Sequence, residues 1–181
     1  MTKIPEIMSR EEIAEDKRYV FDAIIGSRGR IAAPFSLLLH SPEVAGRIAH
    51  LGAYLRYEST LPPACRELVI LATAREWDNS YEWAVHAPLA HREGVREEVI
   101  GMIAHRGELG NLTGAEAVVV KYCLELLRDR QVSDATLEAA KALWGNQGLV
   151  ELTATIGYYS MLACILHAFA AEAPPNAPRL P

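Results

Sequence analysis

Apolar positions recur every three or four residues along most of the chain, and the alternating pattern of a strand is hard to find. This spacing is typical of amphipathic and buried α-helices. The expected helices cover residues 9–26, 41–57, 64–76, 79–94, 96–105, 113–130, 133–145 and 149–171. The pattern therefore predicts an all-α fold of seven or eight helices.

Several expected helix ends carry recognisable capping residues. The pairs that mark a start are Ser9 with Glu12, Ser41 with Pro42, and Thr113 with Glu116. Asp78 or Asn79 can cap the fourth expected helix, and Gly94 follows its end. Pro88 lies inside that helix and should kink it, because proline lacks the backbone N–H group.

The domain organisation follows from length and from the distribution of proline. A chain of 181 residues suits one domain, which we expect over residues 1–173, with residues 1–60 as an N-terminal helical extension of a core at residues 61–173. Residues 174–181 are rich in proline and predict a flexible tail. The valine run at 118–120 and the apolar last helix favour a homo-oligomer over a compact monomer.

Composition narrows the possible partners. The net charge is −5 and basic residues form no stripe, which disfavours nucleic-acid binding. The most apolar stretch, Met161–Ala171, is shorter than the roughly 18 residues of a membrane span. No secretory segment follows Met1, so we expect a cytoplasmic protein that does not bind a membrane.

The familiar catalytic and cofactor motifs are missing from the sequence. The chain has no phosphate-binding glycine loop, no HExxH, no GxSxG and no CxxC. Cys65, Cys123 and Cys164 stand far apart and are odd in number, which argues against disulfides and a zinc cluster. We therefore expect neither a metal nor a cofactor.

Three polar residues in apolar segments are the candidate catalytic group: Glu67, Glu82 and His86. Glu82 and His86 are four residues apart and share one helix face. A carboxylate raises the pKa of a neighbouring imidazole and burial lowers it, so the pair could exchange a proton near neutral pH. A second carboxylate such as Glu67 would give two inequivalent acids.

Ordinary structural roles are the alternatives for these residues. Glu82 and His86 could be an ion pair on a solvated helix face, and Glu67 could be a first-turn residue favoured by the helix dipole. A metal held by all three is a further reading, although no ligand-spacing motif supports it. Trp83 is expected to pack, or to wall a pocket beside the pair.

The segments around these residues resemble the carboxymuconolactone decarboxylase family, which shares its fold with the alkylhydroperoxidase D-like proteins. The resemblance is carried by RELVILATA from Arg66, YEWAVH from Tyr81 and GVREEVI from Gly94. It is good over about residues 62–103 and looser through residues 112–167. It implies an all-α fold of helical hairpins, assembled as trimers or hexamers.

The resemblance also separates two chemistries. The alkylhydroperoxidase D branch carries CxxCxxxH, with a glutamate fifteen residues before the second cysteine. On this chain that pattern places Asn79 and Glu82 at the cysteine positions and keeps Glu67 and His86. A peroxidase or antioxidant activity is therefore disfavoured, because peroxide reduction by this route needs both thiols.

The cysteine-less branch acts without a cofactor on a small acidic lactone, and it implies a carboxy-lyase in aromatic compound catabolism. In that scheme His86 donates the proton, Glu82 orients and tunes His86, and Glu67 positions or relays the proton. Arg66 could stabilise developing charge, and Arg28 or Arg30 could anchor a substrate carboxylate. Two other readings stay open: a redox protein using one of the three cysteines, and a non-catalytic binding module on the same fold.

Overall fold

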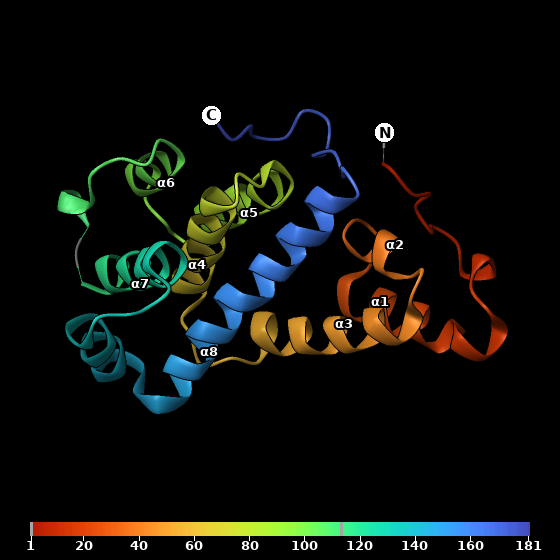
Figure 1. Ribbon diagram of the computed structural model, residues 1–181, viewed down its shortest axis with the longest axis horizontal. Coiled ribbons are helices and arrows are strands. Elements are labelled where there is room, and N and C mark those ends of the chain that lie inside the picture. The colour runs from red at the N-terminus through yellow and green to blue at the C-terminus, as the bar shows by residue number, and fades with distance from the viewer. Residues whose placement is uncertain (1, 113) are drawn as a thin grey trace. The chain divides into compact units, whose positions relative to one another are not determined.

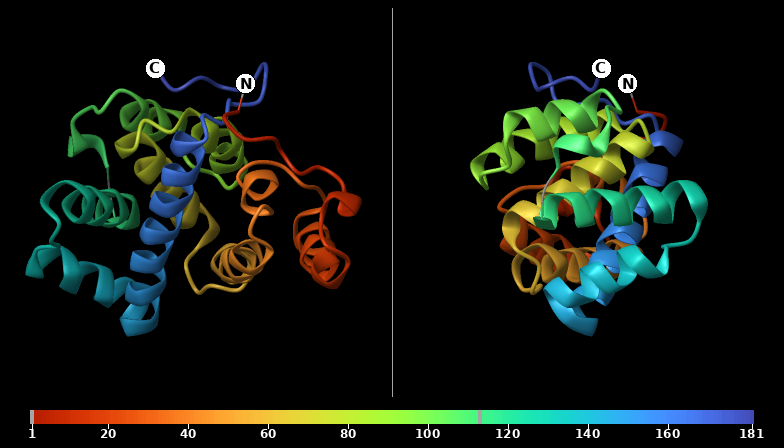
Figure 2. Two further views of the ribbon diagram at one scale, coloured as in Figure 1. Left: turned by 45° about the vertical axis from the view of Figure 1, so that its right-hand side comes forward. Right: turned by 90° about the vertical axis from the view of Figure 1, so that its left-hand side faces the viewer.

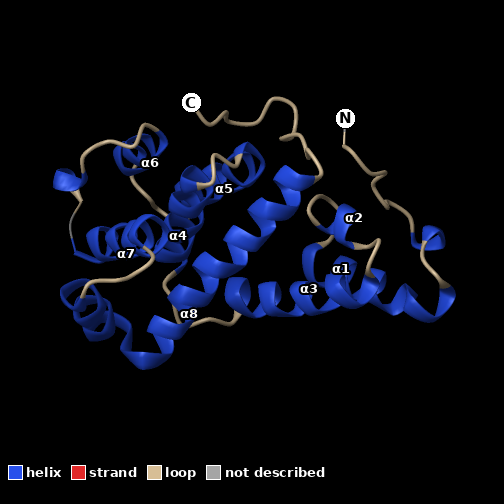
Figure 3. Cartoon of the chain, viewed as in Figure 1, coloured by secondary structure: helices blue, strands red, loops and turns tan. Residues whose placement is uncertain are grey.

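The computed structural model describes residues 2–112 and 114–181, which form helices and loops without a strand (Figures 1 and 3). The eight α-helices within these ranges are α1 (Arg18–Arg28), α2 (Phe35–Leu38), α3 (Pro42–Tyr57), α4 (Pro63–Glu76), α5 (Ser80–Arg92), α6 (Glu97–Ala104), α7 (Gly114–Leu124) and α8 (Asp134–Ala168). The short turns are the 3₁₀ segments η1 (Arg10–Glu12), η2 (Glu15–Lys17) and η3 (Leu109–Asn111), and the π-helical segment η4 (Glu125–Asp129). The predicted all-α fold is confirmed.

The chain forms two compact units. The first comprises residues up to 58 together with residues 164–172, and the second comprises residues 59–163 and 173–181. In the first unit α3 packs against both α1 and α2. That residues 1–173 act as one domain stays a prediction.

The first helix begins later than the sequence predicts. Ser9 and Glu12 do form the expected capping box, and the Ser9 N–H group donates to Glu12 Oε1 at 2.8 Å. The turn ends at once, because Ile13 adopts an extended conformation and is buried to 4% exposure. Regular helix begins at Arg18, so burial of Ile13 divides the predicted helix at residues 9–26.

The next helices match the prediction closely. Asn79 caps α5, since its side-chain oxygen accepts hydrogen bonds from the N–H groups of Tyr81 and Glu82. Gly94 follows the end of α5 with φ +85°, a conformation that favours glycine. Pro88 lies within α5, which nevertheless continues to Arg92.

The last helix changes direction at a single glycine (Figure 2). Gly145 has φ 65° and ψ −172°, a region open almost only to glycine. The predicted pair of helices at residues 133–145 and 149–171 thus appears as α8 with a sharp break. The capping role expected of Thr113 lies outside the described residues.

The length and composition of α8 would also allow it to cross a membrane. Its most apolar window has a mean hydropathy of 1.5, and half of that window is buried inside the protein. A core helix has the same properties, so this is weak evidence for a membrane span.

Helix α4 is the centre of the second unit. Nine of its residues are buried, on nearly every face, and it packs against α5, α6 and α7 (Figure 1). A helix surrounded in this way cannot present a polar side chain to water. Any polar group on its central turns must therefore find a partner within the protein.

Candidate functional site

The structure brings the three candidate residues together inside the second unit. Glu67 lies on α4, and Glu82 and His86 lie on the neighbouring helix α5. Their exposed fractions are 4%, 4% and 2%. Three ionisable groups are thus withdrawn from water at the α4–α5 contact.

The imidazole of His86 lies between the two carboxylates. His86 Nδ1 is 2.7 Å from Glu67 Oε2, and His86 Nε2 is 3.4 Å from Glu82 Oε2. An imidazolium donates from both ring nitrogens, so its protonated form satisfies an acceptor on each side. The shorter contact joins the two helices, and the longer one lies within α5.

Two opposing effects set the pKa of His86. Burial by itself lowers the pKa, because it penalises the charged imidazolium, whereas the hydrogen bonds and charges of Glu67 and Glu82 raise it. The net direction is a raised pKa. The proton on His86 is therefore held more firmly than in water, as a general acid near neutral pH requires.

A tyrosine of α8 packs against the imidazole of His86, and a second tyrosine packs against the first. The rings of Tyr159 and His86 meet edge to face, with centroids 5.2 Å apart and an interplanar angle of 88°. Tyr158 contacts Tyr159 in a similar manner at 5.3 Å, and both tyrosines are buried. The ring of His86 is therefore fixed by packing as well as by hydrogen bonds.

Two structural alternatives for these residues are wrong. Glu82 and His86 are not a solvated pair, since both are buried. Glu67 is not a first-turn residue, because α4 begins at Pro63 and has no acidic residue in its first turn. The partner of Glu67 is the imidazole of His86 rather than the end of the helix.

The metal interpretation finds no support in the geometry. Within residues 2–112 and 114–181 no group of three His, Cys, Asp or Glu side chains is arranged to hold a metal ion. Glu67 and Glu82 approach opposite nitrogens of one ring, so their oxygens do not converge with a nitrogen on a common point.

Two of the three cysteines are poor nucleophiles. Cys123 is fully buried, and burial raises its pKa to about 12 despite a 3.4 Å contact with the hydroxyl of Thr73. Burial also raises the pKa of Cys65. Cys164 is exposed on α8. Buried thiols that stay protonated do not attack peroxides readily.

Trp83 does wall a cavity, as the sequence suggests, but the cavity belongs to another face of α5. Trp83 and Ala87 line a space of about 660 Å³ that is completed by residues of α6 and by Pro178, Arg179 and Pro181. Glu67, Glu82 and His86 are not among its lining residues.

The arginines proposed as anchors are placed as follows. Arg28 donates to the carbonyl of Ala49 and lies 4.2 Å over the ring of Phe35, whereas Arg30 is exposed. Both arginines belong to the first unit. Arg66 is half-buried on α4, and its nearest acceptor is the carbonyl of Leu61 at 3.5 Å.

Asn79 is a further candidate, which the sequence analysis treated as a helix cap and as the residue at the first cysteine position of the CxxCxxxH pattern, but not as a catalytic group. Its side chain is 2% exposed, and Nδ2 is buried without a hydrogen-bond partner among residues 2–112 and 114–181. Asn79, Glu82 and His86 follow an i, i+3, i+7 spacing and so share one face of α5. This spacing is the sequence signal that could have placed Asn79 beside Glu82 and His86. Only the structure shows that its amide Nδ2 is buried and has no hydrogen-bond acceptor among the described residues.

The segment that contains Glu67, Glu82 and His86 matches a known protein family. Residues 42–123 match the model of the carboxymuconolactone decarboxylase family, which confirms the resemblance seen in the sequence. No curated protein sequence matches the chain.

Several solved structures share the fold, among them the three that follow. An uncharacterised peroxidase-related protein with an AhpD core from Ralstonia eutropha is 14% identical and has a TM-score of 0.78, with 96% of this chain and 93% of that chain covered. A protein of unknown function from Agrobacterium tumefaciens, named for AhpD antioxidant defence, is 16% identical, with a TM-score of 0.65 and coverages of 76% and 95%. A variant of the debrominase Bmp8, in complex with 2,3,4-tribromopyrrole, is 11% identical, with a TM-score of 0.74 and coverages of 97% and 95%. At these identities the likeness concerns the fold alone.

Proposed function

The chain carries a segment of the carboxymuconolactone decarboxylase family, residues 42–123, on an AhpD-like fold, and from this premise we propose that it is a cofactor-free acid–base enzyme. The reaction would be decarboxylation, or a related proton transfer, on a small acidic substrate of the lactone type. The observation that carries the proposal is the buried His86 held between Glu67 and Glu82.

The proposed decarboxylation needs one proton and no electron carrier. The bond between the substrate carbon and its carboxylate breaks, carbon dioxide leaves, and the electron pair passes into a conjugated carbonyl to give an enolate. His86 then protonates the enolate carbon and is reprotonated through its carboxylate partners. The raised pKa of His86 favours the proton-bearing form that this step requires.

The two contacts of His86 suggest different roles for the carboxylates. The 2.7 Å contact favours Glu67 as the residue that orients the ring, since a short charge-assisted hydrogen bond is strong. The contact between His86 Nε2 and Glu82 Oε2 is longer, at 3.4 Å, and therefore weaker. Nε2 is thus the ring nitrogen that can more easily leave its carboxylate partner and donate its proton to a substrate atom. Asn79 Nδ2 is a donor available for the enolate oxygen, in the manner of an oxyanion hole.

The test is whether the protein turns over any member of a panel of lactone acids and β-keto acids. Turnover is measured as release of carbon dioxide and as incorporation of deuterium from the solvent into the product. His86→Gln should lose turnover by a factor of about 10² or more, the usual contribution of a general acid. His105→Gln is the matched control, because His105 is exposed at the end of α6. Equal rates in wild type and His86→Gln, or a wild type inactive on the whole panel, would refute the proposal.

The substitution Asn79→Ser tests the donor separately. Serine is also a good helix cap, so α5 should persist while the Nδ2 group is lost. Loss of an oxyanion donor lowers kcat by about 10²- to 10³-fold. An unchanged kcat would restrict Asn79 to capping.

A thiol peroxidase is the alternative raised by the peroxidase-related neighbour. Its chemistry would depend on Cys65, Cys123 or Cys164, of which the first two are buried with raised pKa values. A variant with serine at all three positions should consume peroxide no differently from wild type. Peroxide consumption that disappears in this variant would support the alternative and contradict the decarboxylase proposal.

A further inference from the structure

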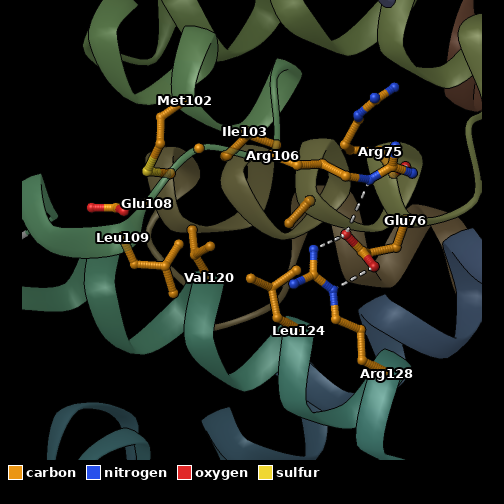
Figure 4. Close-up of a pocket in the computed structure, with 12 residues that line it drawn as sticks. Arg75, Glu76, Met102, Ile103, Arg106, Glu108, Leu109, Val120, Leu124 and Arg128 are labelled. Atoms are coloured by element: carbon orange, nitrogen blue, oxygen red, sulfur yellow. Dashed lines mark hydrogen bonds and ion pairs between the residues drawn. The ribbon is translucent and has the colours of Figure 1, made fainter.

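A second cavity lies on the side of α4 that faces α6 and α7, away from the residues discussed above. Its volume is about 130 Å³, and Figure 4 shows the side chains that line it. The apolar side chains that line it are Ala72 of α4, Met102 and Ile103 of α6, Leu109 of η3, and Val120 and Leu124 of α7. The apolar floor of the space is buried at Ala72, Ile103 and Val120, whereas its mouth opens to solvent between exposed charged residues, namely Arg106, Glu108 and Arg128.

The volume of the cavity limits the size of the ligand that it can hold. Drug-sized ligands occupy pockets of roughly 300–1,000 Å³, which is far more than this space offers. An apolar cavity of about 150 Å³ engineered in another protein stays dry and binds benzene. A volume of about 130 Å³ therefore suits one small ring.

The arginines on the rim of the cavity are engaged in ion pairs with Glu76 and Asp78. Arg128 donates to both oxygens of Glu76, at 2.8 and 2.6 Å, and Arg106 lies near the same carboxylate (Figure 4). Arg106 and Arg75 each donate to Asp78 Oδ1, at 2.9 and 3.0 Å. Glu108 lies on the opposite side of the cavity, beside Leu109, and away from these ion pairs (Figure 4).

These ion pairs determine the charge of the guest. At this end of the cavity an anion would have to displace Glu76 or Asp78 from an arginine, and a cation would have to displace an arginine from one of these two carboxylates. A neutral guest disturbs neither pair and gains the transfer of its apolar surface out of water. We propose that this cavity is a binding site for a neutral, single-ring apolar molecule, distinct from the Glu67–Glu82–His86 site.

The probes are benzene and benzoate, which have the same ring and differ in charge. Benzene should shift the methyl resonances of Val120 and Leu124 saturably, and benzoate should bind at least tenfold more weakly. Methyl groups of the exposed Val44, in the first unit, should not respond. Tighter binding of benzoate, or shifts that grow without saturation, would overturn the assignment.

Two variants change the volume in opposite directions. Ala72→Leu adds an isopropyl group to the cavity wall and should abolish benzene binding, whereas Ala135→Leu makes the same change at an exposed position of α8 and should bind as wild type does. Met102→Ala removes part of the wall and should extend binding to naphthalene. Benzene affinity unaltered in Ala72→Leu, or naphthalene still excluded by Met102→Ala, would contradict the site.

Discussion

Removal of the carboxylate of Glu67 tests the central feature of the site. In Glu67→Gln the side chain keeps its size and can still accept a hydrogen bond from His86 Nδ1, but the negative charge at 2.7 Å is lost. A hydrogen bond to a charged group contributes about 1.5–3 kcal/mol. Because the amide of Glu67→Gln keeps a hydrogen bond, the substitution loses only part of this energy, about 1–2 kcal/mol, and the pKa of His86 should fall.

Glu82→Gln provides the comparison within the same site. Its contact with His86 is longer, 3.4 Å, so its loss should lower the pKa of His86 by less than the loss of Glu67 does. The measurement is an NMR titration of the ring protons, in which His86 is identified by its absence from His86→Gln. The exposed His105 is an internal reference that should titrate identically in every variant.

The sign of the stability effect follows from the direction of the pKa shift. A folded-state pKa above the unfolded value of about 6.5 adds stability that is complete below that pH and is lost as pH rises through the folded pKa. The unfolding free energy of wild type should therefore exceed that of Glu67→Gln most strongly at about pH 6.5, the unfolded-state pKa. The difference between the two unfolding free energies should become smaller as the pH rises through the folded-state pKa of His86. A His86 pKa that is the same in wild type and Glu67→Gln would refute this account of the site.

Two further predictions concern the scaffold of the second unit. Glu151 is buried and accepts from Thr60 N at 2.7 Å, from Thr60 Oγ1 at 2.6 Å and from Gln147 Nε2 at 2.9 Å, so Glu151→Ala should lower the unfolding free energy by about 2–4 kcal/mol in urea titration. A loss below about 0.5 kcal/mol, the range of ordinary surface substitutions, would show that these bonds have little net effect. Gly145→Ala places a side chain at φ 65° and ψ −172° and should cost about 1–3 kcal/mol, which thermal unfolding would detect as a lower Tm. An unchanged Tm would mean that the break in α8 relaxes without strain.

The helices that the sequence predicts well are those with strong local signals. Pro42, Asn79 and Gly94 fix helix ends through their own backbone or side-chain chemistry, and these ends agree with the structure. The Ser9 capping box was an equally good local signal, yet its helix stops after one turn. Burial of Ile13 decides that case, and burial depends on the whole fold.

In the candidate site, too, the local pattern predicts some features, whereas others depend on how the helices pack. Helical periodicity predicts that Glu82 and His86 share a face, but it leaves open whether that face meets water or protein. Glu67 was a candidate because it is a polar residue in an apolar segment, but its close approach to His86 depends on how α4 packs against α5. Tyr159 lies more than seventy residues further along the chain, so no local pattern could place it against the imidazole.

The imidazole of His86 also links two helices, because its Nδ1 bonds to Glu67 of α4 while the residue itself belongs to α5. Its outer bond to Glu67 exists only while α4 and α5 stay side by side, and its edge contact exists only while α8 covers it. Separation of α4 and α5 by about 1 Å would take Glu67 Oε2 beyond hydrogen-bond distance of His86 Nδ1 while the helices themselves stay intact. Loss of activity on heating should therefore precede loss of helical circular dichroism.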